Sequence, residues 1–263
     1  MKWSYIAHLR KVRSVSSLLC AVILLGVLVV PHTPLVDNGF KAPLPYDVDN
    51  KHAYRQYSPP SRPEVDCASV PCLALTFDDG PDTVNTPRVL DVLKSRGVKA
   101  TFFVVGINAA AHPDTVRRMH QEGHEVSNHS WNHADFTTLT PAQIREQIIS
   151  TQIAVMSAGV PAPRWFRPPY GAMNPQVRAH VPLALALWNV DPEDWGNKDP
   201  KVVAEKILAH TGPGRVVDLH DMHAVTAEAI PIVIDTLRPN YHFVTMSDLF
   251  DATAGQRGEY YGR

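Results

Sequence analysis

Residues 73–105 read LALTFDDGPDTVNTPRVLDVLKSRGVKATFFVV, and this segment decides the fold class. Its apolar runs at 73–77 and 100–105 have the length and composition of buried strands. Between them, residues 86–96 carry apolar side chains three and four positions apart, as an amphipathic helix does, and a glycine follows. Strands that alternate with helices in this way predict a parallel α/β sheet.

The alternation of strand and helix continues towards the end of the chain. Further strands are predicted at 124–127, 165–167, 185–190, 216–219 and 242–245, and further helices at 113–122, 141–158, 202–210 and 226–238. About seven such units in one domain favour a closed or nearly closed (β/α) barrel over an open sheet.

The first 66 residues differ in composition from the rest. Basic residues at 2, 10, 11 and 13 precede an apolar run at 18–30, which predicts a signal peptide or membrane anchor over residues 1–30. No Ala-x-Ala-like site follows the run before Pro31, so we favour an uncleaved anchor on an exported protein; cleavage would give a secreted one. Residues 31–66 are rich in proline and predict an extended tether.

Charge and cysteine content narrow the function classes. The chain has 25 Lys and Arg against 26 Asp and Glu, a balance that gives no electrostatic footprint for nucleic acid. We expect a monomer.

In an exported chain, Cys67 and Cys72 are expected to form a disulfide rather than a metal site, and the alternative is two free thiols.

Ionisable side chains follow most of the predicted strands. They are Asp78 and Asp79 after the first strand, His129 and His133 after the third, Arg167 at the end of the fourth, Asp191 and Asp194 after the fifth, and His220 at the end of the sixth. In α/β barrels the chemistry lies at the carboxyl ends of the strands. The sequence therefore predicts one polar site at that end.

The histidine pair and the aspartate pair have the composition of a hydrolytic metal site. His129 and His133 are four residues apart, which on a helical turn would place both imidazoles on one face. One carboxylate of Asp78 and Asp79 could complete the ligand set while the other serves as general base. Each pattern alone has a plain alternative, because Asp-Asp-Gly is a common turn and such histidine spacing occurs by chance. Together they predict one divalent ion, with zinc first and cobalt, nickel or manganese as alternatives.

Three further segments supply groups suited to a sugar substrate. Arg167 and Tyr170 lie in a proline turn that presents a guanidinium and an aromatic ring, although a purely structural turn is the alternative. Trp195 adds an indole on which a sugar could stack. His220 ends a buried strand, where a general acid could protonate a leaving amine.

In order and content, these segments resemble the NodB-homology polysaccharide deacetylases, carbohydrate esterase family 4. The five motifs are Thr76-Phe-Asp-Asp-Gly80, His129-Ser-Trp-Asn-His133, Arg167-Pro-Pro-Tyr170, Asp191-Pro-Glu-Asp194-Trp195 and Val217-Asp-Leu-His220. The resemblance covers the chain from Cys67 to Phe250. It implies a distorted (β/α) barrel of about seven units, with the catalytic domain over residues 67–263.

The resemblance also implies a role for each residue. The metal ligands would be Asp79, His129 and His133; the catalytic groups would be Asp78 as base, Arg167 as its tether, His220 as acid and Asp191 as the partner that tunes His220. The backbone of Tyr170 would help to hold the oxyanion, and Trp195, Asp218 and Leu219 would contact substrate. The implied reaction is hydrolysis of the N-acetyl group of N-acetylglucosamine-type residues in a polysaccharide, giving a free amine and acetate.

The identity of the polymer stays open at this level. An anchor and a tether favour peptidoglycan, with chitin-type oligosaccharide or O-acetyl xylan as alternatives. A glycan-binding module without catalysis also stays open, because Asp218 stands where the family has an aliphatic residue. Residues 216, 218 and 220 share one face of a strand, so Asp218 is expected to reach the site beside His220.

Overall fold

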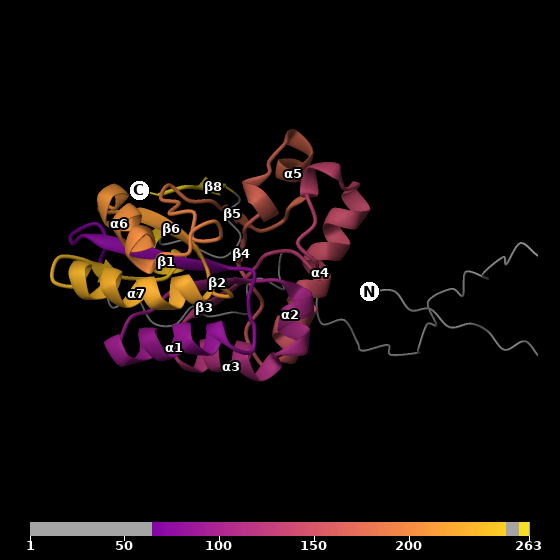
Figure 1. The fold of residues 1–263 in the computed structure, drawn as a ribbon. Coiled ribbons are helices and arrows are strands. Elements are labelled where there is room, and N and C mark those ends of the chain that lie inside the picture. Colours follow the sequence, from indigo (N-terminus) through magenta and orange to yellow (C-terminus); the bar gives the residue numbers. More distant parts are fainter. Residues whose placement is uncertain (1–64, 251–257, 263) are drawn as a thin grey trace, which may run out of the picture. The chain divides into compact units, whose positions relative to one another are not determined.

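The computed structural model describes residues 65–250 and 258–262 (Figure 1). Its sheet is parallel, with the strand order β6-β1-β2-β3-β4-β5-β8, and β7 pairs with the start of β1. The strands are β1 (Cys72–Asp78), β2 (Thr101–Val104), β3 (Glu125–Asn128), β4 (Trp165–Phe166), β5 (Ala184–Ala186), β6 (Arg215–His220), β7 (His242–Phe243) and β8 (Glu259–Tyr260). The helices are α1 (Asn85–Arg96), α2 (Gly106–Ala111), α3 (Pro113–Gln121), α4 (Pro141–Ser157), α5 (Pro175–His180), α6 (Pro200–His210), α7 (Ala224–Leu237) and α8 (Met246–Phe250), with 3₁₀ turns η2 (Phe136–Thr138) and η3 (Pro169–Gly171).

Strand β1 is covered on both faces, since all seven of its residues are buried. Leu73 and Phe77 lie on the face towards the helices, in one apolar cluster with Leu90 of α1 and Ile230 of α7. Ala74 lies on the opposite face, in a second cluster inside the curled sheet. This alternation decides which side chains of each strand can reach the interior of the barrel.

The sheet curls until its two sides approach each other. Val190, after β5, forms a parallel bridge with Val217 of β6, and Gly262, after β8, forms an antiparallel bridge with Arg215. Helices cover the outside, where α7 packs on both α1 and α6 (Figure 1). The predicted α/β fold is therefore confirmed as a curled parallel sheet covered by helices.

Most differences from the prediction concern short elements. Helices α2, α5 and α8 span six residues or fewer, which is too short for an apolar period to be recognised. The strand predicted at 185–190 ends at Ala186, because the next residues leave the neighbouring strand before Val190 reaches β6.

The predictions for residues 1–30 and 31–66 fall almost wholly outside the described residues, which begin at residue 65. Within the described ranges, we find no helix with both the length and the hydropathy that a membrane crossing requires.

The predicted disulfide between Cys67 and Cys72 is confirmed, and it ties the start of the described chain to the first residue of β1.

Closing so short a loop is expected to contribute about 2 kcal/mol to the free energy of unfolding. Replacing both cysteines by serine should therefore lower that free energy by about 2 kcal/mol, measured by urea unfolding. In unreduced, denatured wild type, thiol titration should find only Cys20 reactive; reactive Cys67 and Cys72 would contradict the bond.

Candidate active site

The polar side chains predicted at the strand ends gather in two layers inside the barrel. In the outer layer, Asp78 of β1 and His220 of β6 are direct partners in the strand register. One layer deeper, Thr76 and Asp218 are partners in the same way. The guanidinium of Arg167, which follows β4, lies between these layers and contacts both aspartates.

Three side chains form a ligand set for one cation. Single ligand atoms of Asp79, His129 and His133 lie within 4.8 Å of one another. Asp79 Oδ1 is 3.5 Å from His129 Nε2 and 3.3 Å from His133 Nε2. This oxygen is buried and has no hydrogen-bond partner. A buried carboxylate oxygen without a donor, facing two imidazole nitrogens, fits a divalent metal ion.

His129 is held in the orientation and charge state that metal binding requires. Its Nδ1 is 2.8 Å from the carbonyl oxygen of Arg167, so Nδ1–H donates and Nε2 keeps a lone pair facing Asp79. Burial lowers the pKa of His129 to about 3, and the Asp79 charge opposes this only in part. The imidazole is therefore neutral at physiological pH, as a ligand must be.

The prediction that His129 and His133 lie on a helical turn was wrong. The segment between them is a compact loop in which Ser130 and His133 have positive φ angles of 71° and 59°. His133 N–H donates to Ser130 Oγ, and Trp131 N–H donates to Gln147 Oε1 of α4. These bonds, rather than helical geometry, bring the two imidazoles together.

Backbone strain concentrates in the site. In the described ranges, the non-glycine residues with positive φ are Asp79, Ser130, His133, Tyr170 and Glu193, all within or next to the five motifs. Such conformations cost free energy and persist where surrounding contacts hold them.

At Asp79 the holding contacts come from two residues that the motifs do not include. Asn108 Nδ2 donates to the Asp79 carbonyl oxygen, and the next N–H, that of Gly80, donates to Asp221 Oδ1. No sequence signal singled out Asn108. Asp221 directly follows His220 and is 1% exposed, so its place beside the last motif was the available clue.

Asp78 is a buried carboxylate fixed by Arg167, as the resemblance implied. Arg167 Nη1 donates to Asp78 Oδ1 at 2.8 Å, and the guanidinium itself is fully buried, 4.2 Å from the centre of the Phe103 ring. Burial raises the pKa of Asp78 to about 6, against the opposing charges of Arg167 and His220. This carboxylate is consequently a stronger base than a solvated one.

The carboxylate that contacts His220 is that of Asp194, so the assignment of Asp191 to this role was wrong. Asp194 Oδ1 lies 2.8 Å from His220 Nδ1, and Oδ2 accepts from the His220 backbone N–H. Asp191 instead accepts from the backbone N–H of Glu193, which turns its carboxylate to the loop. Burial alone would lower the pKa of His220, but the hydrogen bond and charge of Asp194, with the charges of Asp218 and Asp78, raise it to about 10.

A pH profile tests this pairing. His220 can act as an acid only while protonated, so activity is lost as pH rises through its pKa. In Asp194→Asn the carboxylate charge is gone, which should move the alkaline limb of kcat/KM down by about 1 to 3 pH units. Asp191→Asn is the matched control and should leave that limb in place; the reverse result would restore Asp191 as the partner.

The predicted substrate-binding residues separate into two groups. Tyr170 and Trp195 are 70% and 62% exposed at the strand ends, and the Tyr170 ring lies edge-on to His133 at 4.5 Å between centroids. Asp218 points into the barrel and contacts Arg167. Leu219 does not reach the site: it is fully buried on the opposite face of β6 among the residues that pack against the helices, so its assignment was wrong.

Comparison of this chain with known proteins identifies the family to which it belongs. The family model described as polysaccharide deacetylase matches residues 66–183. A chitooligosaccharide deacetylase from Bradyrhizobium sp. is 43% identical over 151 residues, 56% of this chain and 69% of the relative. The chain belongs to the polysaccharide deacetylase family.

Two further proteins similar to this chain are informative. A peptidoglycan-N-acetylglucosamine deacetylase from Listeria monocytogenes is 42% identical over 179 residues, which are 68% of this chain but only 38% of the relative. This chain thus matches well under half the length of that relative. The structure of a family 4 acetyl xylan esterase from Clostridium thermocellum in complex with a cobalt ion has a TM-score of 0.69 and 35% identity, covering 73% of this chain and 98% of that one.

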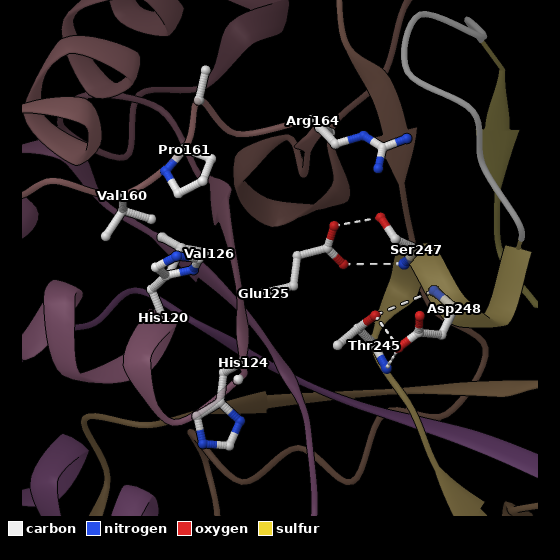
Figure 2. A pocket seen from close by; sticks show the side chains of 12 residues that line it. His120, His124, Glu125, Val126, Val160, Pro161, Arg164, Thr245, Ser247 and Asp248 are labelled. Atoms are coloured by element: carbon white, nitrogen blue, oxygen red, sulfur yellow. Dashed lines mark hydrogen bonds between the residues drawn. The ribbon is translucent and has the colours of Figure 1, made fainter. Parts of the chain in front are cut away.

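A separate hollow lies at the amino end of the sheet, away from the candidate active site. It has a volume of about 330 Å³ and is lined by residues that include Glu125, the first residue of β3. Figure 2 shows the Glu125 carboxylate reaching Ser247 of α8, whose backbone N–H donates to it at 3.0 Å. Beside it, Thr245 donates to Asp248. The contact between Glu125 and Ser247 attaches α8 to β3, and the bond between Thr245 and Asp248 caps the start of α8.

Proposed function

We propose that this protein hydrolyses the N-acetyl group of N-acetylglucosamine-type residues in a cell-wall polysaccharide. The observation that carries the proposal is the combination of a three-ligand cation site with a fixed base and a fixed acid. Asp79, His129 and His133 form the ligand set. Asp78 and His220 lie next to it as register partners on adjacent strands.

Each catalytic side chain is held by a contact that suits its task. Arg167 orients Asp78, whose carboxylate takes a proton from the attacking water. Asp194 orients His220 through Nδ1 and keeps it cationic, so that its Nε2 proton is available to the departing nitrogen. Water adds to the amide carbon, the C–N bond breaks, and the nitrogen leaves as an amine that has received this proton. A covalent intermediate with the protein is not needed.

The cation proposed for the ligand set is zinc, with cobalt, nickel or manganese as alternatives. When bound, it would polarise the amide carbonyl and lower the pKa of the attacking water. Two imidazoles and one carboxylate with an open position are typical of catalytic zinc. A solved relative was obtained with cobalt.

Peptidoglycan is the polymer that we favour. The Listeria relative is named for peptidoglycan N-acetylglucosamine, whereas the Bradyrhizobium relative is named for chitooligosaccharide, so both remain in the test. We further propose that residues 1–30 anchor the protein to the membrane and that residues 31–66 act as a tether towards the wall. The basic flank and apolar run support this, and so does the disulfide, which is typical of exported chains.

Acetate release tests the function directly. The protein is incubated with defined N-acetylglucosamine oligomers, purified peptidoglycan and acetylated xylan, with and without a chelator. We expect chelator-sensitive acetate release from the N-acetylated substrates, greatest with peptidoglycan. Binding to these glycans without acetate release would instead support the non-catalytic module.

A further inference from the structure

Asp218 gives the floor of the active site an unusual chemical character. It lies on the inward face of β6, one layer beneath His220, and its side chain is 5% exposed. Its neighbours on the opposite face, Val217 and Leu219, belong to the apolar cluster under the helices. The floor of the site is therefore a carboxyl group that retains a small accessible surface.

The protein engages one oxygen of this carboxyl group, Oδ1, through Arg167. Asp218 Oδ1 accepts from Arg167 Nη1 at 2.6 Å, and the same nitrogen contacts Thr76 Oγ1 and Asp78 Oδ1, each at 2.8 Å. Within the described part of the chain, Asp218 Oδ2 has no hydrogen-bond partner. Because a carboxyl oxygen accepts hydrogen bonds, this oxygen is available to a donor that enters from the site.

The register places Asp218 one layer beneath the pair formed by Asp78 and His220. Asp78 and His220 are partners on neighbouring strands, about 4.8 Å apart, so the amide carbon lies between the base and the acid. Asp218 is two residues earlier on β6, about 7 Å deeper. A substituent that extends inward from that carbon is directed towards this layer, where Asp218 Oδ2 can accept a hydrogen bond from it.

A plain methyl group matches this floor poorly. It offers no donor to the carboxyl group and would leave the free oxygen without a partner after water is displaced. A hydroxyl group on the same carbon would donate a hydrogen bond to Oδ2. Sites that hydrogen-bond a substrate hydroxyl discriminate strongly against analogues that lack it.

We propose that Asp218 makes this site select an N-linked hydroxyacetyl (glycolyl) group over a plain acetyl group on the amino sugar. This inference rests on the proposed amidohydrolase function. The step is unchanged: water adds to the amide carbon, the C–N bond breaks, His220 protonates the nitrogen, and the products are a free amine and glycolate.

The test compares two substrates that differ by one hydroxyl group. Full-length, metal-loaded protein is assayed on glucosamine oligomers of one length, either N-glycolylated or N-acetylated. We expect kcat/KM to favour the glycolyl substrate by at least about tenfold in the wild type. Asp218→Leu should remove this preference and raise kcat/KM on the acetyl substrate, while Asp218→Asn, which keeps an acceptor, should fall between.

Thr76→Val is the matched control, because Thr76 contacts the same nitrogen of Arg167 from the same layer. It should lower the rate on both substrates by a similar factor and leave their ratio unchanged. As a second readout, glycolate should inhibit the wild type more strongly than acetate does, and Asp218→Leu should abolish that difference.

The outcomes separate the two proposals. Equal rates on both substrates in the wild type overturn the role of Asp218 but leave the proposed function standing. If the ratio of kcat/KM on the glycolyl and acetyl substrates shifts as much in Thr76→Val as in Asp218→Leu, the preference depends on the position of Arg167. That result also overturns the role of Asp218. Failure to hydrolyse either substrate, with metal bound, overturns the proposed function and this inference with it.

Discussion

Replacing Asp79, His129 or His133 by alanine should remove the bound divalent ion and lower kcat/KM by at least about 10³-fold. The three ligand atoms lie within 4.8 Å of one another, and no other described group of three His, Cys, Asp or Glu side chains meets this criterion. A two-ligand remnant would bind the ion weakly, and both carbonyl polarisation and water activation depend on it.

The measurement is elemental analysis of each purified variant, together with acetate release before and after addition of Zn, Co, Ni or Mn. His180→Ala is the matched control, since His180 is an exposed histidine on α5 whose Nδ1 bonds to the carbonyl oxygen of Gln176 in the same helix. It should retain both metal and rate. Wild type that holds no ion and gains no activity from any of these metals would refute the metal site.

The positions of site residues on strands were predictable from the sequence. Side chains alternate between the two faces of a strand, and the carboxyl ends of parallel strands lie at the same edge of the sheet. Asp78, Asp79, Arg167 and His220 all end or follow buried strands, and the structure brings them together. The same rule correctly placed Asp218 on the face of His220. Applied consistently, it would also have excluded Leu219, which lies one position away on the other face.

The contacts made by site residues in loops were not predictable from the sequence. Asp191 and Asp194 are three residues apart in one loop, and only tertiary contacts select Asp194: its carboxylate is held by the His220 backbone N–H and by Thr226 of α7. The approach of His129 to His133 likewise depends on Gln147, which lies in the following helix α4, outside the loop itself. Neither contact leaves a local sequence pattern.

Asp78→Asn is expected to lower kcat by about 10² to 10⁴-fold while the bound ion is retained. The substitution keeps the shape of the side chain and an oxygen that accepts from Arg167, but an amide cannot take a proton from water. Asp79, the neighbouring ligand, is untouched. This combination of lost rate and retained metal distinguishes the base from the three ligands, whose variants should lose both.

The thermal stability of Asp78→Asn shows whether its lower rate comes from the loss of a catalytic group or from a folding defect. Burial raises the folded-state pKa of Asp78 to about 6, above its usual value, so the ionised carboxylate costs folding free energy at higher pH. A neutral asparagine removes that cost, and the thermal midpoint of metal-free Asp78→Asn at pH 8 should equal or exceed that of the wild type. Below about pH 3, where the carboxyl group is protonated in both the folded and the unfolded state, the difference should vanish. A variant that loses its ion, or unfolds at a lower temperature at pH 8, would show that Asp78 supports the site structurally and would remove it from the role of general base.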